Sequence, residues 1–165
     1  MRCRLFVTLA VALPMVARAQ SPGLSSIRED STLAGIQTVG LLISDANGAL
    51  GAPLVAQLAA STTLELRKTG LRVIRIDTAT KAGVNFDALV QVLIYRRGRF
   101  GGDDVDMRYL VRQPVTLVRT QKQLWETTWI AERRGQNLVV KDAVPRMLTE
   151  AINEFLSKWL DMNGR

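Results

Sequence analysis

Histidine is absent from this chain of 165 residues, and cysteine occurs only once. Without histidine the chain cannot build a Ser-His-Asp triad, a histidine zinc ligand or an imidazole general base. A single cysteine forms neither an internal disulfide nor a cysteine cluster for a metal. The G-x-G-x-x-G, G-K-[ST] and S-x-x-K patterns are also missing. We therefore predict a protein without catalytic residues, cofactor or bound metal.

The N-terminus has the three parts of a secretory signal peptide. Two arginines in the first four residues precede an apolar run over residues 5–16, and an A-x-A site ends at Ala19. The run has 12 residues, whereas a membrane-spanning helix needs about 20. We expect export, cleavage between Ala19 and Gln20, and a periplasmic or secreted mature protein with no transmembrane segment. Cys3 leaves with the signal peptide.

Cleavage also lowers the charge of the protein. The chain has 22 basic and 15 acidic residues, a net charge of +7, and the signal peptide carries three of the basic residues, so the mature chain is left at +4. Residues 20–34 are polar and rich in serine, which is typical of a flexible leader. The remaining length suits one domain over residues 35–165.

Hydrophobic periodicity predicts five strands and two helices in that domain. We expect strands over 35–44, 71–76, 88–96, 105–119 and 122–133, and helices over 52–69 and 142–162. The order is β-α-β-β-β-β-α, and a strand–helix–strand unit with short joints makes its two strands parallel. The fold class is therefore α/β, an α+β two-layer sandwich. In it, two helices pack on one face of a mixed five-stranded sheet and the other face stays wet.

The predicted strand 105–119 alternates apolar and polar side chains, and its polar side is the predicted wet face. Arg108, Leu110 and Arg112 share that side and are candidates for contact with a partner protein. Exposed apolar residues scattered on a wet face are also ordinary surface. Pro114 cannot donate to a ladder and marks an edge or a bulge.

Two tryptophans stand out in the last predicted strand. Trp125 and Trp129 are four residues apart, so the alternation of a strand places them on the same face. Exposed, they would form a binding hot spot. We expect instead that both belong to the core, because large aromatic side chains dominate core packing.

The hairpin predicted at 98–104 brings arginines and aspartates together. The arginines are Arg96, Arg97 and Arg99, and the aspartates are Asp103, Asp104 and Asp106. The arginines can bind phosphate or carboxylate groups of an anionic lipid or polymer, or they can pair with the aspartates as ordinary surface charges. The D-D-x-D spacing lacks the glycine and glutamate of a calcium loop.

Four segments carry a resemblance to known proteins. They are G-I-x-T-V-G at 35–40, E-L-R-K-x-G-L-R-V at 65–73, L-V-R-Q-P-V-T-L at 110–117 and T-T-W at 127–129. With the export signal and a closing amphipathic helix, they resemble a group of uncharacterised bacterial exported proteins. In element order the chain is also similar to cell-envelope accessory domains, namely the N-terminal domain of the Tol–Pal β-propeller protein and the penicillin-binding-protein activator lipoproteins. The resemblance implies an envelope location and no catalytic residue.

These observations predict a non-enzymatic accessory or protein-interaction module of the bacterial cell envelope. We expect an envelope protein as its partner and no nucleic acid, because aromatics are not interleaved with the basic residues. The alternative is a domain that binds an anionic ligand or lipid through the basic hairpin at 96–99. The candidate partner-binding residues are Arg96, Arg97, Arg99, Arg108, Leu110 and Arg112.

Overall fold

The computed structural model describes residues 32–48, 50–76, 85–99 and 102–164. The predicted signal peptide and most of the predicted leader lie outside these residues. The elements are β1 (Thr38–Asp45), α2 (Ala52–Lys68), β2 (Arg72–Arg75), β3 (Ala88–Arg99), β4 (Gly102–Thr116), β5 (Gln123–Leu138) and α3 (Val140–Asn163). The predicted element order is confirmed.

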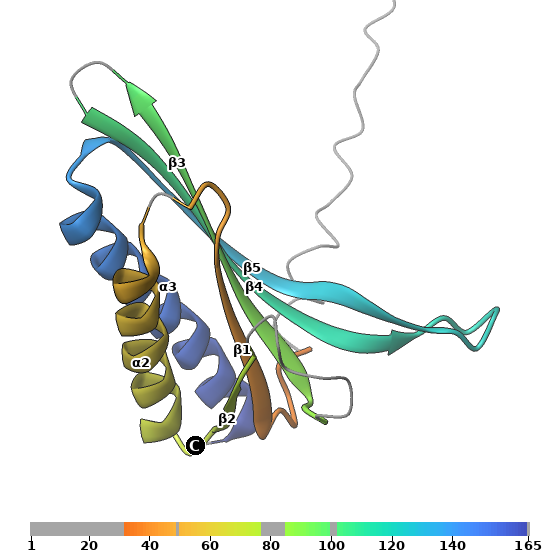
Figure 1. Ribbon diagram of the computed structural model, residues 1–165. Coiled ribbons are helices and arrows are strands. Elements are labelled where there is room, and N and C mark those ends of the chain that lie inside the picture. The colour runs from red at the N-terminus through yellow and green to blue at the C-terminus, as the bar shows by residue number, and fades with distance from the viewer. Residues whose placement is uncertain (1–31, 49, 77–84, 100–101, 165) are drawn as a thin grey trace, which may run out of the picture.

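The strands form one mixed sheet in the order β2-β1-β3-β4-β5. β1 is parallel to β2, as the crossover through α2 requires, and it is also parallel to β3. β3, β4 and β5 form an antiparallel meander. Both helices lie on the same side of the sheet (Figure 1). The chain is therefore the predicted two-layer α/β sandwich.

The two helices form where their apolar stripes predict, but α3 starts earlier than expected. α2 begins with proline at its first positions and ends before Gly70, whose φ of 94° favours glycine. α3 begins at Val140 with Val139 as its N-cap, so the predicted start at residue 142 is two residues late. Pro145 consequently lies inside the helix, where it removes one backbone hydrogen bond.

The hairpin between β3 and β4 is tighter than the sequence indicated. Pairing continues through Arg97 opposite Asp104 to Arg99 opposite Gly102, so the predicted loop over 98–104 is wrong. Opposite charges on facing strands stabilise a ladder, which explains why the strands extend to the end of the hairpin. β5 likewise runs on to Leu138.

The core lies between the helices and one face of the sheet. Tyr109, Trp129 and Phe155 pack together with ring centroids 5.7–5.9 Å apart. The indole nitrogen of Trp159 donates to the carbonyl oxygen of Ile36 at 3.0 Å in a buried site. Leu33 is also buried, although its position falls in the predicted leader, so packing begins two residues before the predicted boundary at 35.

Trp125 does not share a face with Trp129, and the shared-face prediction is wrong. The β4–β5 register is irregular here: Val111 pairs with Trp129 but Arg112 pairs with Thr127, so Thr128 is the extra residue of a bulge. The bulge moves the side chains that precede it to the opposite face. Trp129 is 5% exposed in the core, as predicted, whereas Trp125 is 40% exposed and its ring lies tilted against that of Phe86, with centroids 5.2 Å apart.

Candidate functional site

We call the sheet face turned away from the helices the open face. It contains Arg108, Leu110 and Arg112, as the alternation of the strand predicted, because their neighbours Tyr109 and Val111 are fully buried on the helix side. The register extends this face onto β5, where Leu110 lies opposite Ile130. Arg108 is exposed, and Leu110 and Arg112 are half-buried.

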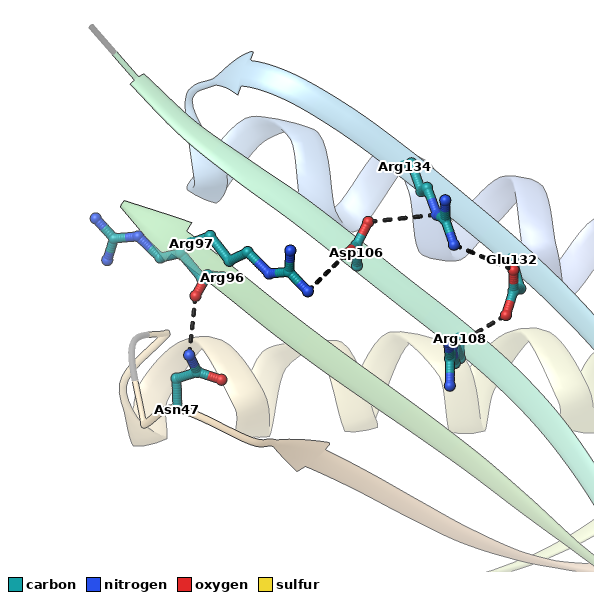
Figure 2. Close-up of polar contacts among 7 residues, drawn as sticks. All are labelled: Asn47, Arg96, Arg97, Asp106, Arg108, Glu132 and Arg134. Atoms are coloured by element: carbon teal, nitrogen blue, oxygen red, sulfur yellow. Dashed lines mark hydrogen bonds and ion pairs between the residues drawn. The ribbon is translucent and has the colours of Figure 1, made fainter. Parts of the chain in front are cut away.

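A chain of ion pairs crosses the open face from β3 to β5 (Figure 2). Asp106 contacts Arg97 at 4.0 Å and Arg134 at 3.6 Å. Glu132 contacts the same Arg134 at 3.8 Å and Arg108 at 3.0 Å. Exposed ion pairs of this kind contribute about 0–1 kcal/mol each to stability. The network therefore arranges charges on the surface more than it holds the fold together.

These side chains surround a shallow hollow of about 280 Å³. Three guanidinium groups face two carboxylates across the hollow, which leaves one positive charge in excess. Arg97 and Arg134 have side chains that are each 72% exposed. A guanidinium offers five N–H donors, and one or two ion pairs do not use them all, so this surface can still bind carboxylates of a partner.

The arginines of the β3–β4 hairpin do not form one basic group. Arg96 lies opposite Val105, a residue of the helix side, whereas Arg97 points onto the open face. Arg96 pairs with Asp103 at 2.8 Å, and this contact raises the pKa of Arg96. Both arginines thus have acidic neighbours in their own hairpin, as the surface-pairing interpretation predicted. The side chain of Arg99 lies outside the described residues.

The three aspartates of the hairpin are likewise divided between the two faces. Asp103 pairs with Arg96, and Asp106 pairs with Arg97 and Arg134, so two of them already neutralise arginines. Within the ranges that the structure describes, no group of three or more acidic, cysteine or histidine side chains is arranged to hold a metal ion.

β4 and β5 continue past the rest of the sheet as a two-stranded projection (Figure 1). We call residues 113–126 the hairpin arm, because pairing between β3 and β4 ends at Arg112. Pro114 has no β3 residue opposite it, which agrees with the prediction that this proline marks an edge. The arm and the turn at its end carry exposed apolar side chains, which are Leu117, Val118, Leu124 and Trp125.

Sequence reasoning missed the contribution of β5 to the open face. Ile130, Glu132 and Arg134 alternate with the core residue Trp129 and the residues that follow it, so the alternation itself was a usable signal. The partner strand could not be identified without the register, and the bulge at Thr128 concealed it.

In the described part of the chain, no helix has the length and apolar character needed to cross a membrane.

No family model matches the chain, and no curated protein matches it. Solved structures are similar to it at low identity, and three of them are described here. The PelC dodecamer from Paraburkholderia phytofirmans is 16% identical, with 76% of this chain and 87% of that chain covered and a TM-score of 0.42. The hypothetical protein CT253 from Chlamydia trachomatis is 12% identical over 74% and 94%, with a TM-score of 0.44. Lipoprotein GNA1162 from Neisseria meningitidis is 14% identical over 73% and 98%, with a TM-score of 0.39. Likenesses this distant assign neither a site nor a function.

Proposed function

We propose that this protein is a non-enzymatic interaction module, exported to the bacterial cell envelope, which binds a protein partner through the open face and the hairpin arm. One observation carries the proposal. Of the eight large hydrophobic side chains exposed among the described residues, five lie on β4, β5 or the turn that joins them. They are Leu117, Val118, Leu124, Trp125 and Ile130.

The composition of this surface favours a protein partner. Protein interfaces combine an apolar centre with a polar rim, and tryptophan and arginine contribute most to their binding energy. Here Ile130 lies opposite Leu110 on β4 and next to the arginine–carboxylate network, and Trp125 lies on the same sheet face farther along β5, in the hairpin arm. The excess positive charge of the network favours a partner surface that carries carboxylates.

The alternative, an anionic ligand bound by the hairpin at 96–99, gains no specific support. Arg96 and Arg97 point to opposite faces and each contacts an aspartate of the same hairpin. An anion would therefore compete with carboxylates already in place.

Co-purification from an envelope extract tests the proposal with matched variants. Ile130→Glu places a charge at the centre of the proposed surface, whereas Leu64→Glu changes a leucine that is 56% exposed on α2. We expect a partner retained by the wild-type protein and by Leu64→Glu, and lost from Ile130→Glu. Arg108→Glu, which reverses one charge of the network, should weaken the same interaction.

Circular dichroism shows whether the variants are folded, so that loss of binding is not loss of structure. Equal retention of the same protein by Ile130→Glu and the wild type would contradict the proposal. Enrichment of no protein at all would contradict it equally.

A further inference from the structure

At the β2 side of the sheet, only half of β1 has a neighbouring strand. β2 has four residues and pairs with β1 from Thr38 to Leu41. β1 continues for four more residues, Leu42 to Asp45, and there it pairs with β3 alone. This part of β1 therefore presents an edge on the side where β2 has ended.

Two backbone hydrogen bonds show which backbone groups face that edge. The carbonyl oxygen of Leu41 accepts from the N–H of Ile76 at 2.8 Å on the β2 side, whereas the N–H of Ala46 donates to Ile94 at 3.0 Å on the β3 side. Successive residues of a strand direct their backbone groups to opposite edges. The N–H and the carbonyl of Ile43 therefore point to the β2 side, where no strand of the described chain pairs with them. Unpaired groups in a row are a template for another strand.

A groove of about 710 Å³ lies along this edge. β1 forms one wall through Leu42 and Ile43, and α2 forms the other through Val55 and Ala59. The volume is within the range of about 300–1,000 Å³ that ligand pockets show. Its lining is mostly apolar, so the side chains of a strand placed against β1 would meet an apolar helix surface.

The charge at one end of the groove favours an acidic occupant. Arg75 lines one end, where its Nε donates to Thr63 at 3.2 Å and no carboxylate of the described residues pairs with it. α2 begins at the other end without a side-chain cap and without an acid in its first turn, which leaves its N-terminus positive. Asp45 also lines the groove near this end, and its carboxylate, which accepts the N–H of Leu50 at 2.7 Å, offsets the positive helix terminus. The preference for an acidic occupant therefore comes from Arg75.

We propose that this groove binds an extended acidic peptide segment of another protein, which adds as a strand beside β1. Backbone pairing with Ile43 supplies affinity, and the apolar wall and Arg75 supply selectivity, as in other cases where a peptide extends a sheet edge. The groove is formed by β1, α2 and the end of β2, and it contains none of the residues named in the first proposal, which lie on β3, β4, β5 and the turn between β4 and β5. Either proposal can therefore be refuted without affecting the other.

Fluorescence anisotropy with labelled peptides and the full chain tests the site. The probes are the acidic peptide Glu-Val-Thr-Val-Glu-Val, its analogue with lysine for glutamate, and two forms with N-methyl groups on alternate residues. We expect the acidic peptide to bind at least about tenfold more tightly than the lysine analogue, with one N-methyl form losing binding and the other keeping it. No saturable binding of the acidic peptide up to roughly 1 mM, or equal binding of both N-methyl forms, would overturn the proposal.

Variants of the protein locate the binding. Val55→Arg fills the groove and should weaken binding of the acidic peptide about tenfold. Arg75→Glu should make the protein bind the lysine analogue more tightly than the acidic peptide. Ala60→Arg adds the same side chain to an exposed α2 position outside the groove and should change nothing. Wild-type affinity in Val55→Arg would place the peptide elsewhere and refute the site. Self-association that Val55→Arg abolishes would show a second copy in the groove, and this too would refute an acidic partner.

Discussion

The bulge at Thr128 predicts that two tryptophans in one strand differ sharply in what they contribute to stability. A tryptophan that is fully buried removes about 150–250 Å² from water, and replacing such a residue by alanine costs about 3–5 kcal/mol. Trp129 is 5% exposed and lies between Tyr109 and Phe155, so we expect Trp129→Ala to cost about 4 kcal/mol.

Trp125→Ala should cost much less. Its side chain is 40% exposed and its described aromatic neighbour is Phe86, so its removal opens no closed cavity and water fills the space. We expect a loss of about 1–2 kcal/mol from the smaller buried area. The difference between the two variants is therefore about 2–3 kcal/mol, a large share of a domain's total stability of about 5–15 kcal/mol.

Urea unfolding followed by far-ultraviolet circular dichroism measures both changes. Trp129→Phe and Trp125→Phe form a milder pair in case Trp129→Ala does not fold, and the order of their losses should be the same. Equal losses at the two positions, or a larger loss at Trp125, would refute the assignment of the two side chains to opposite faces.

Three further predictions concern the packing. Burial raises the pKa of Tyr109 above its ordinary range, and its hydroxyl has no hydrogen-bond partner among the described residues. Tyr109→Phe should therefore raise the free energy of unfolding by about 1 kcal/mol, measured by thermal denaturation. A clear decrease would show that the hydroxyl is hydrogen-bonded. Trp159→Phe leaves the Ile36 carbonyl unpaired and should cost about 2–3 kcal/mol in urea, and an unchanged midpoint would contradict the bond. A Cβ at Gly40 would lie 2.5 Å from the terminal Cδ1 of Ile76 and 3.1 Å from two ring atoms of Phe86, so both side chains must shift, whereas at Gly98 the nearest atom is 3.7 Å away. Gly40→Ala should therefore lose about 1–2 kcal/mol in the same assay while Gly98→Ala stays within about 0.5 kcal/mol, and equal effects would contradict the contact.

Much of the fold follows from local patterns in the sequence. The apolar stripe of α3 and the alternation of β4 each define one buried face, and those faces can only meet in a two-layer sandwich. The buried positions of Tyr109 and Phe155 are examples of what periodicity alone predicts.

The parts that could not be predicted depend on how distant segments pair. The extra residue at Thr128 shows no signal in β5 itself, because the bulge is defined by its register with β4. The same register brings Glu132 beside Arg108 and so builds the network of the open face. The early start of α3 depends likewise on tertiary packing, because Val140 packs against the core.

The central claim, that the open face binds a protein, is tested most directly by photo-crosslinking in the producing cell. A photoreactive amino acid is introduced in place of Ile130 on the open face, and in a second strain in place of Leu64 on α2, two positions with similar exposure. We predict a discrete crosslinked product from position 130 that position 64 does not form. No product at position 130, or the same product at both positions, would contradict the claim.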